Sequence, residues 1–184
     1  VRSRGLGDVY KRQIADIYGL CEWYKDRNDF KGGDGNMTQK TCEKCDGAVA
    51  YFHLPGLFEF YGLYSLFLPL FYNHREHFYD WCEIGSIYGA PADCLWGGGR
   101  VGFGDDEAEK VLRLTQKYGI SARLTFSNSL IKQEHLSDRK CNRLCEMFSE
   151  SKAVQNGVII CSDLLLEYIG KNYPGLYFVS STTK

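Results

Sequence analysis

The sequence predicts an α/β fold, namely a partial parallel (β/α) barrel of the TIM type with about five strands, truncated before the barrel closes. Three observations favour it. Short apolar runs alternate with helix-like segments from residue 48 onward, the third run alternates apolar and polar residues, and the chain ends at Lys184 directly after the last run. Strands joined by helices of roughly ten to fifteen residues pair in parallel, because each crossover returns the chain to the same edge.

The segments before this repeating part do not suit the same fold. Residues 1–13 are rich in Lys and Arg and have no amphipathic period, so we interpret them as a non-native leader; a native basic arm is the alternative. Residues 14–47 form an irregular N-terminal segment that contains the glycine-rich stretch 31–35. The predicted N-terminal part of the barrel is therefore residues 48–184.

The first predicted strand is Ala50–Leu54, which a Pro-Gly pair terminates. The aromatic-rich stretch 57–72 follows and is predicted to be an amphipathic helix packed on the core. Glu59 and Pro69 interrupt this stretch, whereas a membrane span needs about 20 consecutive apolar residues. One face of the helix is expected to carry Phe60, Leu63, Tyr64 and Phe67.

The later elements follow the same scheme. Residues 82–88 form the second predicted strand, and a helix over about residues 105–118 leads to the third strand, Ser121–Ser127. Gly119 is well placed as the C-terminal cap of that helix. The remaining predictions are a helix over 136–148, a strand over 157–161, a helix over 163–172 and a strand over 176–180.

The third strand distinguishes a barrel from an open sheet. Apolar residues at 122, 124 and 126 alternate with the polar residues Arg123, Thr125 and Ser127. An open parallel sheet covered on both faces would be apolar on both, whereas a polar row suits the interior of a barrel that leads to a site at the carboxyl ends of its strands. Inside a barrel, Arg123 is expected to pair with Glu83 or with a ligand anion, because an unpaired buried charge is costly.

Composition limits the class of protein. The chain of 184 residues has a formal net charge of −1 and is 44% hydrophobic, which is ordinary for one globular domain and argues against a surface that binds polyanions throughout. Eight cysteines without a secretion signal favour reduced thiols in the cytoplasm. We therefore predict a cytoplasmic protein without a membrane span.

Two pairs of cysteines have spacings that suit a metal. Cys42 and Cys45 are separated by two residues, which lets both sulfurs reach one zinc ion. A structural zinc site needs a second pair, which is not apparent, so a plain loop is the favoured alternative. Cys141 and Cys145 lie one helical turn apart and are expected to act as small buried hydrophobic residues.

The loops after the strands of a barrel form its site, so position selects the ligand-binding candidates. Tyr88, Trp96 and Arg100 lie after the second strand. Arg100 follows three glycines and could present a guanidinium fork to a carboxylate or phosphate, or it could close a tight turn.

Further candidates are Asn128 and His135 after the third strand, and Ser162 and Thr182 after the fourth and fifth. His135 could act as a general base, although a solvated loop histidine is the commoner case. Ser162 could bind a ligand or cap the next helix. The sequence has no nucleophile elbow, His-Glu-x-x-His pair or phosphate-binding loop, so the catalytic residues stay unknown.

Several short segments, taken in order, resemble the peptidase U32 (collagenase-like) family. They are HLPG at 53–56, IGSIY at 84–88, GGR at 98–100, LTFSN at 124–128, GVIICSD at 157–163 and YPGL at 173–176. Their order and spacing carry the resemblance, which extends from about residue 51 to the end of the chain. The Ser-Thr-Gln usual in the family after the fifth strand is replaced by Ser-Thr-Thr at 181–183.

The resemblance implies a TIM-type barrel and either a protease or, in some branches, an enzyme that hydroxylates RNA or a quinone precursor with a cysteine-bound iron–sulfur cluster. The cluster cysteines of the family lie downstream of this chain, so the resemblance assigns no ligand here. We predict a divergent member, present as an N-terminal fragment that is inactive without the other half of its chain, with a small-molecule, peptide or RNA substrate. The alternative is a non-catalytic barrel that binds an anionic small molecule or a glycan.

Overall fold

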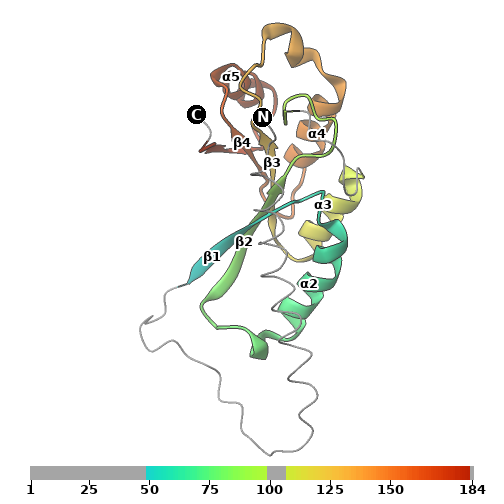
Figure 1. The fold of residues 1–184 in the computed structure, drawn as a ribbon, viewed down its shortest axis with the longest axis vertical. Helices are drawn as coiled ribbons and strands as arrows, with labels where there is room; N and C mark the ends of the chain where they lie inside the picture. The colour runs from blue at the N-terminus through green and yellow to red at the C-terminus, as the bar shows by residue number, and fades with distance from the viewer. Residues whose placement is uncertain (1–48, 99–106, 183–184) are drawn as a thin grey trace, which may run out of the picture. The chain divides into compact units, whose positions relative to one another are not determined.

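The computed structural model describes residues 49–98 and 107–182 (Figure 1). The predictions for the leader 1–13, the segment 14–47, the pair Cys42 and Cys45, and Arg100 lie outside these residues. The elements in chain order are β1 (Ala50–Pro55), α2 (Tyr61–Asn73), η1 (Arg75–His77), β2 (Cys82–Gly89), α3 (Ala108–Lys117), β3 (Ser121–Phe126), η2 (Gln133–Ser137), α4 (Arg139–Ser149), β4 (Gly157–Ile160), α5 (Asp163–Asn172) and β5 (Tyr177–Ser180).

The five strands form one sheet in which every neighbouring pair is parallel and the spatial order equals the chain order, β1-β2-β3-β4-β5. A helix follows each of the first four strands, and Figure 1 shows α2, α3 and α4 along one side of the sheet. A doubly wound sheet reverses its strand order at a switch point, and this sheet does not. The sheet curls as half of a (β/α) barrel does, so the predicted fold class is confirmed.

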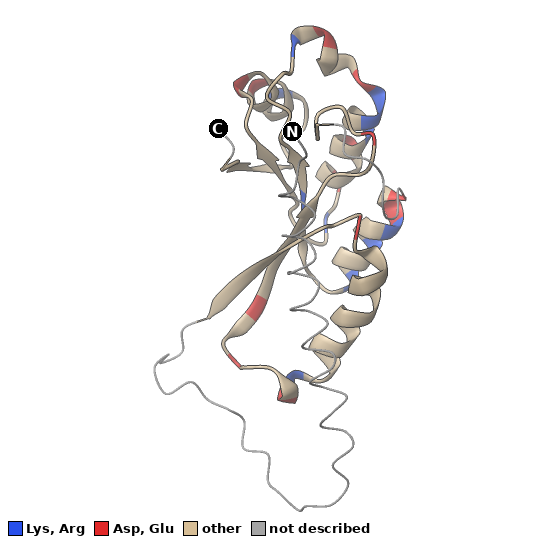
Figure 2. Cartoon of the chain, in the orientation of Figure 1, with Lys and Arg blue, Asp and Glu red and all other residues tan. Residues whose placement is uncertain are grey.

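One face of the sheet forms the core beneath the helices. Ala122, Leu124 and Phe126 of β3 are completely buried there, as the alternation in the sequence predicts. Ile87 of β2 and Val158 of β4 lie beside Ala122 and Leu124 in the register and are equally buried. Full burial of such a side chain stabilises the fold by about 1.5–3 kcal/mol. Charged residues lie mainly on the helices and turns, with few on the strands (Figure 2).

A register irregularity in β2 changes which of its residues face the core. The pairing with β1 shifts between Phe52 and His53, so that Gly85 is the extra residue of a β-bulge. Ile84 and Ile87 therefore both pack toward the core although they are three residues apart. The bulge turns Ser86 to the opposite face, where strict alternation from Ile84 would not have placed it.

Helix α2 confirms the predicted amphipathic helix with a shifted buried face. Its fully buried side chains are Tyr64, Leu68 and Phe71, while Phe67 is only partly buried. Pro69 lies inside the helix without ending it. Among the residues that the structure describes, no helix has the length and apolarity required to cross a membrane.

The predicted helix 136–148 is divided into the short 3₁₀ helix η2 and α4. The division occurs at Asp138, whose carboxylate accepts a hydrogen bond from the backbone N–H of Cys141 at 2.8 Å and so caps α4. Asn142 then joins α4 to α5, because its Oδ1 accepts from the hydroxyls of Tyr168 at 2.9 Å and Tyr173 at 2.7 Å.

Candidate functional site

The face of the sheet opposite the core carries polar side chains on two adjacent register lines. Strand register settles which residues these are, because residues paired across neighbouring parallel strands point to the same face. The pairs that cross the sheet on this face are His53 with Ser86, Ser86 with Ser121, Tyr88 with Arg123, Arg123 with Gly157, and Gly157 with Tyr177. We call this set the inner row.

Arg123 is the charged centre of the inner row. Its Nε donates a hydrogen bond to the hydroxyl oxygen of Tyr177 at 2.7 Å, and its guanidinium carbon lies 5.4 Å from the centre of that ring. Ser121 Oγ lies 2.7 Å from the same hydroxyl. One tyrosine from β5 therefore holds two side chains of β3 across the intervening strand.

The structure contradicts the expected ion pair between Arg123 and Glu83. Glu83 instead accepts a hydrogen bond from Arg75 Nη2 at 3.1 Å. The register explains the difference, since it places Tyr88 rather than Glu83 beside Arg123. Among the described residues, no carboxylate lies within ion-pair distance of Arg123. The partner of its guanidinium is the phenol hydroxyl of Tyr177 and not an acidic side chain.

Gly157 creates the space for this contact. A Cβ atom at position 157 would lie 2.6 Å from the ring of Tyr177, closer than such atoms approach in folded proteins. The bare backbone of β4 thus lets the tyrosine ring lie across the strand and reach Arg123. The arrangement requires glycine for close approach, because the ring occupies the position of a side chain.

His53 and Ser86 form the second polar contact of the row. The imidazole Nδ1 lies 2.8 Å from Ser86 Oγ. Burial, and then the positive charge of Arg123, hold the pKa of His53 below its usual value of 6.5, which favours the neutral imidazole. Ser86 is completely buried, so its hydroxyl orients the imidazole and is not placed as a nucleophile.

The inner row lies near the ends of β1 and β2 but at the starts of β3, β4 and β5, because Ser121, Gly157 and Tyr177 are the first residues of their strands. The register places Pro55, the last residue of β1, beside Tyr88, and Tyr88 beside Arg123. Barrels build their sites at the carboxyl ends of the strands, and only the part of the row on β1 and β2 lies at that end. Two sequence-predicted candidates, Tyr88 and Arg123, are thus brought together, and both are partly accessible.

Trp96 has a different position from the one predicted. Its side chain is fully buried, and its Nε1 donates to the backbone carbonyl of His135 at 2.8 Å. The indole packs edge-to-face on Phe126 at 5.3 Å and on Tyr168 at 5.9 Å between ring centres. Trp96 therefore anchors the loop after β2 in the core and presents no surface to a ligand in this structure.

Asn128 and His135 make contacts within the connection from β3 to α4. Asn128 donates through Nδ2 to the carbonyl of Leu95 at 2.9 Å and accepts at Oδ1 from the N–H of Leu130 at 2.9 Å. His135 Nδ1 accepts from the N–H of Lys132 at 3.1 Å. Both side chains shape loops, and their hydrogen bonds go to residues outside the inner row.

The candidates after the last two strands lie apart from this row. Ser162 Oγ accepts from the N–H of Leu165 at 3.4 Å and is the N-cap residue of α5, which is the capping role considered for it. Thr182 is exposed just beyond β5. Their binding of a ligand stays a prediction.

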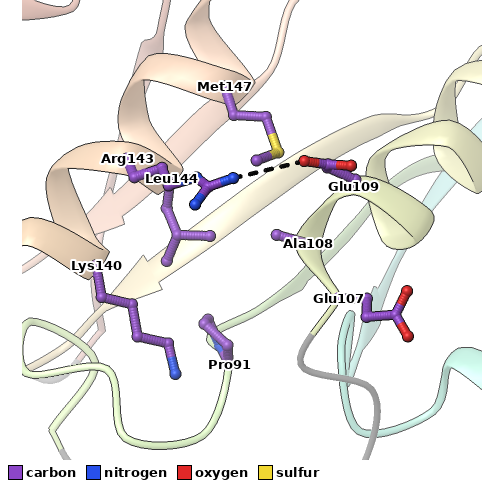
Figure 3. A pocket seen from close by; sticks show the side chains of 8 residues that line it. All are labelled: Pro91, Glu107, Ala108, Glu109, Lys140, Arg143, Leu144 and Met147. Atoms are coloured by element: carbon purple, nitrogen blue, oxygen red, sulfur yellow. Dashed lines mark ion pairs between the residues drawn. The ribbon is translucent and has the colours of Figure 1, made fainter.

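A separate cleft of about 360 Å³ lies between α3 and α4, on the helix side of the sheet (Figure 3). Glu109 of α3 and Arg143 of α4 face each other across it, with a carboxylate oxygen 3.6 Å from the guanidinium. Its apolar walls come from Ala108, Leu144 and Met147. Since opposite charges already pair at this exposed cleft, its geometry favours a ligand less than the inner row does.

Buried thiols contribute to the core and not to a site. Cys94 Sγ lies 3.4 Å from Cys141 Sγ, and both side chains are fully buried. Burial raises the pKa of Cys145, and the hydrogen bond to Cys94 together with burial raises the pKa of Cys141. Protonated thiols are poor nucleophiles and metal ligands, so Cys141 and Cys145 behave as small hydrophobic residues.

Sequence reasoning did not select His53, Ser86 or Tyr177 as site residues. Tyr177 contacts a strand 54 positions away, which no local pattern reveals. The bulge that turns Ser86 inward did leave a signal, because Ile84 and Ile87 are spaced by three residues within an otherwise alternating strand.

Fold and site together define a (β/α) barrel-type sheet with a polar inner face centred on an arginine. No protein-family model matches the chain, and neither a curated protein nor a solved structure is significantly similar to it. The functional argument therefore depends on the geometry of the inner row.

Proposed function

We propose that this chain belongs to a U32-like barrel protein whose inner face binds the anionic group of a small molecule. The observation that carries the proposal is Arg123, which Tyr177 holds at 2.7 Å and which has no carboxylate partner among the described residues. The order of sequence segments that resemble the peptidase U32 family supports the family membership, and the curled parallel sheet is compatible with it.

The chemistry of the inner row suits an anion. The bond from Nε to Tyr177 fixes the plane of the guanidinium, while the terminal Nη groups have no acceptor among the described residues. A guanidinium presents paired N–H groups that match carboxylate and phosphate oxygens. Partial burial strengthens such a contact, because the effective dielectric constant is lower than in water.

Binding is tested by calorimetric titration of inorganic pyrophosphate and citrate into the protein and into Arg123→Gln. We expect the substitution to lower affinity about tenfold or more, since a charge-assisted pair contributes roughly 1.5–3 kcal/mol. Arg113→Gln is the matched control, because it removes the same charge from an exposed position on α3, away from the inner row. The guanidinium of Arg113 lies 4.0 Å from the carboxylate of Glu109. Equal loss in both variants would show non-specific attraction and would overturn the proposal.

An enzyme is the second candidate function, and one observation favours it over a binding protein. His53 is held by Ser86 beside Arg123, with its pKa lowered so that the neutral imidazole can accept a proton. In an enzyme, Arg123 would bind the anionic part of the substrate and His53 would act as general base.

Hydrolysis of denatured collagen and casein peptides by the protein and by His53→Gln separates the two candidate functions. Hydrolysis that His53→Gln abolishes, while affinity for pyrophosphate is kept, supports a peptidase with His53 as base. Hydrolysis that persists in His53→Gln excludes that role for the histidine. Pyrophosphate binding without any hydrolysis supports the anion-binding function and not the enzymatic one.

A further inference from the structure

Three metal-ligating side chains meet on the turn between α2 and β2. His74, Glu76 and His77 each offer one ligand atom, and the three atoms lie within 4.8 Å of one another. His74 Nδ1 is 3.2 Å from Glu76 Oε1, and His77 Nε2 is 3.6 Å from the same oxygen. Two imidazoles therefore converge on one carboxylate oxygen within four consecutive residues.

These separations correspond to those between ligands of a tetrahedral metal. Zinc binds imidazole nitrogen and carboxylate oxygen at about 2.0–2.2 Å, which places neighbouring ligand atoms roughly 3.3–3.5 Å apart in a tetrahedral site. Two of the three separations are close to this range, and the third, between the two imidazole nitrogens, is at most 4.8 Å. Simple ion pairing between Glu76 and protonated histidines is the competing explanation, and metal titration distinguishes the two.

The cationic neighbour of the cluster is engaged elsewhere. Arg75 directs its Nη2 to the carbonyl of Cys82 at 2.9 Å and to Glu83, and its guanidinium carbon lies 4.4 Å from the ring centre of Phe71. Arg75 thus points its charge toward the start of β2. The same contacts fix the turn against the strand, which limits the freedom that the ligands would lose on binding a metal.

The cluster is accessible to a metal from solvent. The side chains of His74 and Glu76 retain 48% and 60% of their surface, and that of His77 retains 29%. A site of two histidines and one carboxylate leaves a coordination position for water, as three-ligand zinc sites do. Imidazole and carboxylate together select transition metals over calcium or magnesium.

We propose that His74, Glu76 and His77 form a binding site for a divalent transition metal, with Zn²⁺ as the ion that fits its spacing. The site lies before β2 and is independent of the inner row, so it goes beyond the proposed anion binding. A bound metal would join the end of α2 to the turn that Arg75 ties to β2.

The test is Zn²⁺ titration of the full chain, followed by NMR of the imidazole nitrogens. Because Cys42 and Cys45 have a spacing that suits zinc, both are replaced by serine in every sample. We expect Zn²⁺ to shift the signals of His74 Nδ1 and His77 Nε2 and to leave those of His53 and His135 unchanged. Addition of a chelator should reverse the shifts.

Substitution provides the second readout. Loss of an outer partner of a metal ligand alone costs roughly 10–100-fold in affinity, so His77→Gln, which removes a ligand, should weaken Zn²⁺ binding at least about tenfold. His135→Gln is the control and should bind as the parent does. Unshifted His74 and His77 signals at excess Zn²⁺, or parental affinity in His77→Gln, would overturn the proposal.

Discussion

The two faces of the parallel sheet have opposite chemistry although they share the same strands. On the helix side, Leu124 and Val158 are completely buried among apolar neighbours. On the inner side, Arg123 and Tyr177 form a polar network joined by hydrogen bonds. In both cases the register decides which residues meet, so the bulge at Gly85 sets which residues of β2 face the core and which face the inner side.

The faces should also differ in what a substitution changes. Core substitutions act on the free energy of unfolding, because buried contacts are lost and cavities form. Inner-row substitutions should act mainly on ligand binding and on local geometry, because this face is partly accessible. The following predictions test this contrast, from the largest expected effect to the smallest.

Trp96→Ala should destabilise the fold by about 3–5 kcal/mol, the range for removal of a large buried aromatic side chain. The substitution removes the contacts with Phe126 and Tyr168 and the hydrogen bond to the carbonyl of His135. Urea denaturation followed by circular dichroism measures the change. A loss below about 1 kcal/mol would indicate that Trp96 is not buried and is available to a ligand, as its position after the second strand predicts.

Gly157→Val should cost about 1–3 kcal/mol through overpacking and should displace Tyr177 from Arg123. The new Cβ atom would lie within 2.6 Å of the tyrosine ring. NMR of the Tyr177 ring reports the displacement, and urea denaturation reports the stability. Gly62→Ala is the control, because no atom lies within 4 Å of its Cβ position; a Tyr177 ring that keeps its signal in Gly157→Val would refute the close approach.

Thr125→Val should change stability by between zero and about 1 kcal/mol in the stabilising direction. Thr125 belongs to the inner face by alternation, is only 8% exposed, and its Oγ1 has no hydrogen-bond partner among the described residues. Replacing an unsatisfied buried hydroxyl by a methyl group of similar volume removes the desolvation cost. Clear destabilisation in thermal unfolding would indicate that the hydroxyl has a partner in solution.

Stability should fall slightly as the pH drops below about 6.5, in a manner that depends on His53. Its folded-state pKa lies below the value of 6.5, so the unfolded chain takes up the proton first, and the stabilisation present above pH 6.5 is lost as the pH falls. The effect is small because the imidazole is largely exposed. His53→Gln should flatten the pH dependence of stability below pH 6.5. An unchanged profile in this variant would show that another group causes the pH dependence.

The elements of this fold were accessible from the sequence because apolar spacing and chain breakers are local. The alternation at 122–126 predicted the buried face of β3, and Gly119 takes the left-handed φ of +66° expected of a helix cap. Arg123 was identified as an inner residue for the same reason. Its expected partner was wrong, since pairing across strands depends on a register that no local pattern contains.

The rest of the site depends on contacts between distant residues. Tyr177 reaches Arg123 only because Gly157 has no side chain, and Ser86 faces inward only because of the bulge at Gly85. Trp96 was chosen as a ligand-binding candidate because it follows the second strand, yet its indole is buried in the core. Local composition predicts where a loop occurs and does not predict which of its side chains enter the core.

The most direct test of an anion site on the inner face is the pKa of His53, measured by NMR with and without inorganic pyrophosphate. The charge of Arg123 helps to hold this pKa down, so an anion bound at Arg123 should raise it, while the signals of His74, His77 and His135 serve as internal references. We expect the rise in the parent protein and its loss in Arg123→Gln. An unchanged pKa at saturating pyrophosphate, or the same rise in Arg123→Gln, would contradict binding at the inner row.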